Sequence, residues 1–106
     1  TVTIQAGGAG VGSAKLEISE TFIIENTGVV ITASETGVLG LIAMEKSTVV
    51  SERDIRVATG AAGKTLVKDS RGGTGNGSMT VTTGSNGSCE AGGNSFSAAV
   101  LLMVCP

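Results

Sequence analysis

Short segments with the two-residue period of a β-strand, separated by turn residues, constrain the fold of this 106-residue chain more than any other feature. Alternating or β-branched segments occupy residues 1–5, 15–25, 29–32, 48–51, 54–58 and 79–82. Clusters of Gly, Asn, Ser and Thr separate them at intervals of about 8 to 12 residues, which is typical of all-β domains. We therefore expect one all-β domain over residues 1–106, with about eight or nine short strands in an antiparallel sandwich, a jelly roll or a small barrel.

Two of the apolar segments need interpretation. Residues 38–44 are apolar without alternation, which favours a strand covered on both faces over a short buried helix. In residues 15–25 the apolar phase contains Leu16, Ile18, Phe22 and Ile24, and Glu20 interrupts it. We expect these four apolar side chains to share one face, with a bulge or bend at the glutamate.

The two cysteines of the chain, Cys89 and Cys105, lie near its C-terminal end. Between them, residues 90–94 have the composition of a turn and residues 96–104 that of one buried strand. A disulfide between the two cysteines would close this loop and add about 3 kcal/mol to stability by the chain-entropy model. We expect this C-terminal disulfide; two reduced core cysteines and an interchain bond are the alternatives.

Composition excludes several classes of function. The formal net charge is −2 and the few basic residues form no run, so the chain lacks the basic surface of nucleic-acid-binding proteins. Histidine is absent, which excludes Ser-His-Asp and Cys-His catalysis. The absence of Trp and Tyr removes the aromatic platforms that hold bases and many sugars. The longest apolar runs are far shorter than the roughly 20 residues of a membrane-spanning helix. We expect no enzyme, no cofactor, no nucleic-acid partner and no membrane-spanning segment.

One Gly-rich segment approaches the pattern of a phosphate-binding loop. Residues 58–65 end in Gly63-Lys64-Thr65, as the loop G-x-x-x-x-G-K-[ST] does, but Ala58 replaces its first glycine. The loop also needs a helix after the lysine, and the Gly-rich residues from position 72 leave no room for one. We therefore expect a plain hairpin turn that binds no nucleotide.

Calcium and glycans are the remaining ligand classes. The candidate calcium ligand is Asp69 or Glu90, together with loop carbonyls, and solvated surface charge is the alternative interpretation of either residue. Asn76 and Asn86 each begin a glycosylation sequon. Scattered carboxylates of this kind indicate no acid and base pair.

Only 15% of the residues are charged, against roughly 25% in soluble domains, which favours a protein whose faces meet other copies of itself. We expect a structural subunit of an extracellular filament, pilus or virion-type surface assembly that associates through strand pairing. The alternative function is a small extracellular carbohydrate- or calcium-binding module.

The N-terminal segment is the expected assembly strand, because the glycines that follow it permit many exit directions. It consists of Thr1, Val2, Thr3, Ile4 and Gln5. In this interpretation Val2 and Ile4 enter a groove of a neighbouring subunit. The alternative is that residues 1–5 pair within their own sheet.

Overall fold

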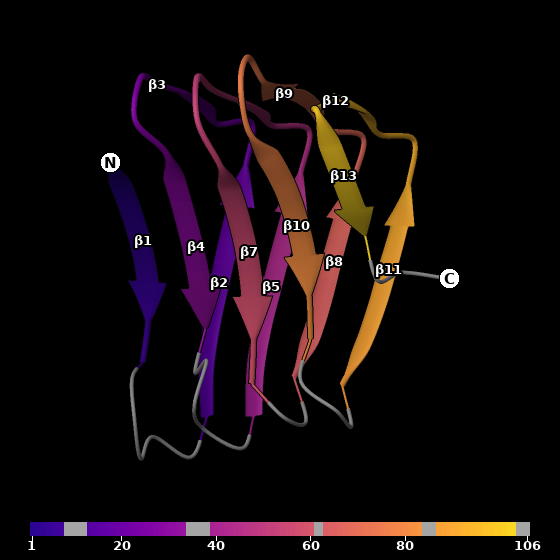
Figure 1. The fold of residues 1–106 in the computed structure, drawn as a ribbon. Helices are drawn as coiled ribbons and strands as arrows, with labels where there is room; N and C mark the ends of the chain where they lie inside the picture. The colour runs from indigo at the N-terminus through magenta and orange to yellow at the C-terminus, as the bar shows by residue number, and fades with distance from the viewer. Residues whose placement is uncertain (8–12, 34–38, 61–62, 84–86, 104–106) are drawn as a thin grey trace.

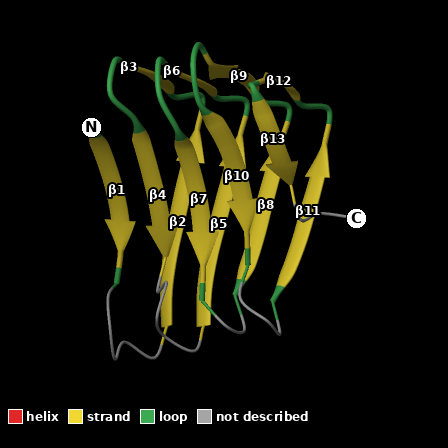
Figure 2. Cartoon of the chain, viewed as in Figure 1, coloured by secondary structure: helices red, strands yellow, loops and turns green. Residues whose placement is uncertain are grey.

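The computed structural model describes residues 1–7, 13–33, 39–60, 63–83 and 87–103. Within these ranges the chain forms thirteen β-strands (Figures 1 and 2). In chain order they are β1 Val2–Ala6, β2 Ser13–Ser19, β3 Phe22–Glu25, β4 Val29–Ala33, β5 Leu39–Glu45, β6 Thr48–Ser51, β7 Ile55–Thr59, β8 Lys64–Lys68, β9 Arg71–Thr74, β10 Ser78–Thr82, β11 Ser88–Gly92, β12 Ser95–Ser97 and β13 Val100–Met103. None of the described residues forms a helix that could span a membrane.

The strands belong to three parallel sheets. Sheet A has the order β1-β4-β7-β10-β13, sheet B the order β2-β5-β8-β11, and sheet C the order β3-β6-β9-β12. Each strand therefore pairs with the strand three places later in the chain, and three successive strands complete one coil (Figure 1). The result is a β-solenoid of roughly four turns.

The all-β prediction is confirmed, but the expected antiparallel sandwich, jelly roll or barrel is wrong. Every pairing between the described strands is parallel. Alternation of side chains identifies a strand whichever way its neighbours run, so it carries no information on direction. The segment interpreted as a hairpin turn, residues 58–65, instead connects β7 in sheet A with β8 in sheet B.

The core lies between the three sheets and is filled from all of them. Sheet A contributes Ile31, Val57 and Val81, sheet B Ile42 and Met44, and sheet C Val49, all fully buried. Partners in register point to the same side of a sheet, so each inward position forms a row of buried side chains along the solenoid. One such row in sheet A is Val2, Val29, Ile55, Met79 and Leu101.

The corner from sheet B to sheet C has the same backbone conformation in every coil. In each coil one residue of this corner has a positive φ, between 50° and 68°; these residues are Glu20, Lys46, Asp69 and Gly93. This left-handed conformation reverses the chain in a single residue. The bend expected at Glu20 is therefore confirmed, and it is the first of four equivalent corners.

A ladder of small polar side chains follows these corners inside the solenoid. The backbone N–H of Ser47 donates to Ser70 Oγ at 3.3 Å, and the N–H of Ser70 donates to Asn94 Oδ1 at 3.0 Å. Ser70 Oγ in turn donates to the carbonyl of Lys68 at 3.0 Å. Both serines are buried, so the ladder satisfies backbone groups that the corners remove from the sheets.

Two predicted segments have a different structure, and one Gly-rich segment forms a strand. Residues 96–104 do not form one strand: β12 and β13 lie in different sheets, separated by a corner. The turn expected at residues 90–94 is largely occupied by β11, and the Gly-rich residues 71–74 form β9. Glycine and serine disfavour strands in isolation, but here the neighbouring parallel strands supply hydrogen bonds on both sides of β9.

Candidate functional site

The predicted assembly strand lies at the open edge of sheet A. Residues 2–6, as β1, pair with β4 of the same chain, and among the described strands none covers the other edge of β1. Val2 and Ile4 are half-buried and pack on the chain's own core. One edge of this strand therefore pairs within the chain's own sheet, as the alternative interpretation above expected.

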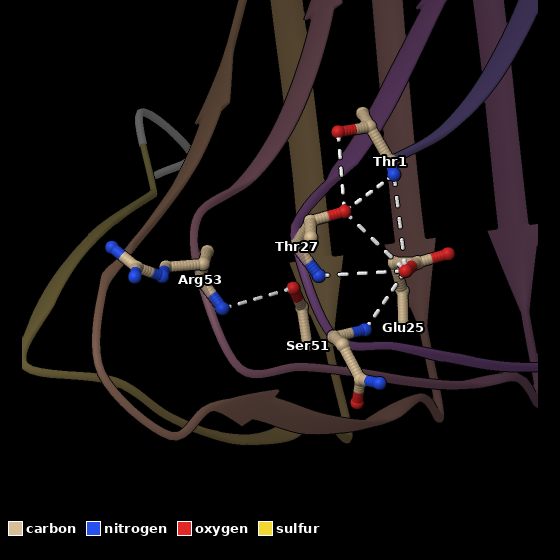
Figure 3. A network of polar contacts seen from close by, with 6 residues as sticks. Thr1, Glu25, Thr27, Ser51 and Arg53 are labelled. Atoms are coloured by element: carbon tan, nitrogen blue, oxygen red, sulfur yellow. Dashed lines mark hydrogen bonds and ion pairs between the residues drawn. The ribbon is translucent and has the colours of Figure 1, made fainter.

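The start of β1 is held by the corner between β3 and β4 (Figure 3). The N-terminal amine contacts Thr27 Oγ1 and lies 3.8 Å from Glu25 Oε1. The amide N–H of Asn26 donates to the Glu25 carboxylate at 2.9 Å and holds the pKa of Glu25 below its ordinary value, while partial burial acts in the opposite direction. A weaker bond from the N–H of Thr27 adds to the lowering.

The opposite edge of sheet A is formed by β13, which carries three exposed apolar side chains. Val100 is 61% exposed, Leu101 44% and Leu102 52%. Leu101 pairs in register with Met79, which points inward and is fully buried. Leu101 is therefore a core position that remains open to solvent, because no described strand lies beyond β13 in sheet A.

A second apolar surface lies on the outer face of sheet C. It consists of Phe22, Ile24 and Val50, of which the first two are 68% and 64% exposed. Ile24 and Val50 are partners in register on β3 and β6. The sequence pattern placed Phe22 and Ile24 on the same face as Ile18, but the left-handed residue at Glu20 shifts the phase by one, so that Ile23 is buried instead.

The outer face of sheet B carries a shallow hollow between β2 and β5. Glu17, Ser19, Ala43 and Glu45 line it, together with part of Ile18. Lys15 Nζ lies 2.8 Å from Glu17 Oε1 and holds the pKa of that carboxyl below its ordinary value. Glu17 and Glu45 are both exposed, so we interpret the Lys15–Glu17 contact as an ion pair on a solvated face.

The two cysteines are not both described. Cys89 is buried on β11 and belongs to the hydrophobic core, whereas Cys105 lies outside the described residues. Cys89, the one cysteine within the described ranges, is not a free thiol. The bond between Cys89 and Cys105 stays a prediction.

The predicted ligand residues, Asp69 or Glu90, lie on different elements of the solenoid. Asp69 is the corner residue between β8 and β9, whereas Glu90 lies on the exposed side of β11. Within the described part of the chain no group of three or more His, Cys, Asp or Glu could hold a metal ion. Asn76 lies exposed in the corner between β9 and β10, and Asn86 falls outside the described residues.

The segment that approaches the phosphate-binding pattern leads into a strand. Lys64 begins β8 and is exposed. Thr65, whose hydroxyl would bind a metal ion in such a loop, is fully buried, and its Oγ1 lies 3.4 Å from Thr59 Oγ1. The hairpin expected here is wrong, because β7 and β8 belong to different sheets.

The features that sequence patterns missed are the two apolar surfaces. Both result from positions that look like core in the sequence: β13 because it ends sheet A, and β3 because its phase shifts at a corner. The sequence does contain a signal for the coiled architecture: a charged residue followed by Thr or Ser recurs at spacings of 23 to 26 residues, in Glu20-Thr21, Lys46-Ser47 and Asp69-Ser70. Such a period is the mark of a solenoid.

Comparison with models of protein families, with curated proteins and with solved structures finds no match for this chain.

Proposed function

We propose that this protein is a structural subunit of an extracellular or particle-surface assembly, of the filament, pilus or virion type, whose copies associate through β-strand pairing. The observation that carries the proposal is β13, a strand at the edge of sheet A with three exposed apolar side chains. The proposal assigns the chain no catalytic activity.

Edge strands of soluble monomers are usually protected against pairing by charged residues, proline, bulges or a covering segment. The described residues of β13 are Val-Leu-Leu-Met, with no charge and no proline. Unpaired N–H and C=O groups beside apolar side chains form a template for another strand. Pairing with a strand of another copy would satisfy these backbone groups and bury the apolar side chains.

The solenoid architecture supports the same conclusion. Each coil buries its apolar side chains only by stacking on the next coil, and the terminal coils of solenoids therefore need a polar cap. Here the last described strand leaves the core position Leu101 nearly half exposed. A second copy would supply the missing layer.

Sedimentation velocity over a wide range of protein concentration, followed by negative-stain microscopy of natively sourced material, tests the proposal. We expect species larger than the monomer whose fraction rises with concentration, and regular assemblies in the micrographs. A protein that stays monomeric at every concentration, without assemblies in native material, would refute it.

A further inference from the structure

We propose that copies join head to tail, with β13 of one copy pairing in parallel with β1 of the next so that sheet A continues from copy to copy. This inference rests on the proposed function and specifies the contact. At each of the two open edges of sheet A, the binding partner is another copy of the chain.

The direction of sheet A supports a head-to-tail contact. All five of its strands are parallel, so its two open edges differ. Each inner strand pairs with the previous strand through one edge and with the following strand through the other. A copy of β1 on β13 therefore repeats the contact that β13 makes on β10. This contact is heterologous, so it propagates along a line instead of closing into a dimer.

The inward row of sheet A supports a particular register. Its members are Val2, Val29, Ile55, Met79 and Leu101, and the three central ones are almost completely buried, whereas the two end members are partly exposed. If Val2 of the next copy lies beside Leu101, the row continues without interruption. Two half-covered apolar ends then cover each other.

The backbone of β1 fits this register. The N–H of Val2 donates to the carbonyl of Gly28 at 3.0 Å, toward β4. Since successive residues of a strand direct their backbone groups to opposite sides, the N–H and C=O of Thr3 face the open edge. In the proposed register this N–H donates to the carbonyl of Leu101 of the neighbouring copy.

The number of strands predicts how strong the contact is. Sheet A has five described strands, whereas sheets B and C have four. When β13 contacts β1 of the next copy, one strand position therefore stays open in sheets B and C at the junction. A single strand pair carries the contact, far below the roughly 1,600 Å² of a standard interface, so association should be weak and strongly dependent on concentration.

Two variants of the full chain block one end each. Thr3→Pro removes the N–H at the open edge of β1, a position where proline is tolerated because that N–H has no role in the chain's own pairing with β4. Leu101→Lys places a charge in the junction on β13. Phe22→Lys, on the outer face of sheet C, is the matched control, because it makes the same kind of change at an exposed apolar residue on a sheet that contributes no strand to the proposed contact.

In sedimentation velocity, each blocking variant should weaken association at least tenfold, and Phe22→Lys should associate like the wild-type protein. Mixing Thr3→Pro with Leu101→Lys should restore a dimer and nothing larger, because the first keeps an intact β13 and the second an intact β1. Far-UV circular dichroism checks that each variant keeps its β-structure.

The failures of the two proposals are distinguishable. Wild-type protein that is monomeric at all concentrations removes the proposed function and this inference together. Wild-type assembly that persists in both blocking variants, or that is lost only in Phe22→Lys, overturns the head-to-tail contact and leaves a self-associating subunit. Recovery of species larger than a dimer in the mixture also contradicts it, since each variant retains one competent edge.

Discussion

Gly72 on β9 is a position where a single methyl group should disrupt the solenoid. Its φ is +135°, and a β-carbon there would contact the carbonyl oxygen of Val49 and lie 2.6 Å from its carbonyl carbon. Val49 is fully buried on β6, the neighbouring strand of sheet C. The obstacle is backbone in the middle of a sheet, so it cannot move aside by a change of rotamer.

The cost of Gly72→Ala has two parts. Holding a residue other than glycine in this region of φ costs on the order of 1–3 kcal/mol. Relieving the contact requires β6 and β9 to separate until about two backbone hydrogen bonds are lost, each contributing about 0.5–1.5 kcal/mol. We expect a loss of about 4 kcal/mol, a large share of the roughly 5–15 kcal/mol by which domains are stable.

Two glycines provide the comparison. Gly73 has a φ of +140°, and its β-carbon would meet Ser97 of β12; because β12 is the last strand of sheet C and can move outward, Gly73→Ala should cost less, about 2 kcal/mol. Gly92 is exposed, and a β-carbon added to it would meet no atom within 4 Å. Gly92→Ala should therefore change stability by less than about 0.5 kcal/mol.

Urea denaturation followed by far-UV circular dichroism measures all three variants, since the chain has no Trp or Tyr for fluorescence. The expected order of destabilisation is Gly72→Ala, then Gly73→Ala, then Gly92→Ala. If Gly72→Ala proves as stable as Gly92→Ala, the close approach of β9 to β6 is refuted.

Ser70→Ala should destabilise the protein by about 1–3 kcal/mol, because the buried N–H of Ser47 loses its acceptor. Ser95→Ala, at an exposed position, is the control and should change stability by less than about 0.5 kcal/mol. The same urea denaturation assay compares the two variants. Folding lowers the pKa of Glu25 below its ordinary value, so its carboxylate stabilises the fold at a pH above that ordinary value and loses this effect as the pH falls through the lower folded pKa. The stability difference between wild type and Glu25→Gln should therefore shrink on acidification, and a difference independent of pH would contradict this account. Intact mass of natively sourced protein should rise by two hydrogens on reduction if the two cysteines are bonded; two free thiols or a linked dimer would oppose the predicted bond.

The candidate surfaces could be located from the sequence only in part. The alternation of residues 1–5 identified β1 and its inward side chains, but β13 was hidden inside a nine-residue apolar segment. That segment contains the corner between β12 and β13, where two alanines stand in place of the glycine and asparagine found in the corners between β3 and β4 and between β9 and β10. Nothing local distinguishes such a corner from the interior of a strand.

Local pattern by itself determined which residues form most strands and which of them point inward. Ile55 and Val57 on β7, or Met79 and Val81 on β10, alternate with polar neighbours and are buried as expected, because the two-residue period is a property of the strand alone. Only the tertiary structure decided the direction and partners of the strands. Each pairing joins residues 22 to 27 positions apart, and β9 is a strand only because β6 and β12 hydrogen-bond to it on both sides. Such contacts depend on the stacking of whole coils, which no short window of sequence contains.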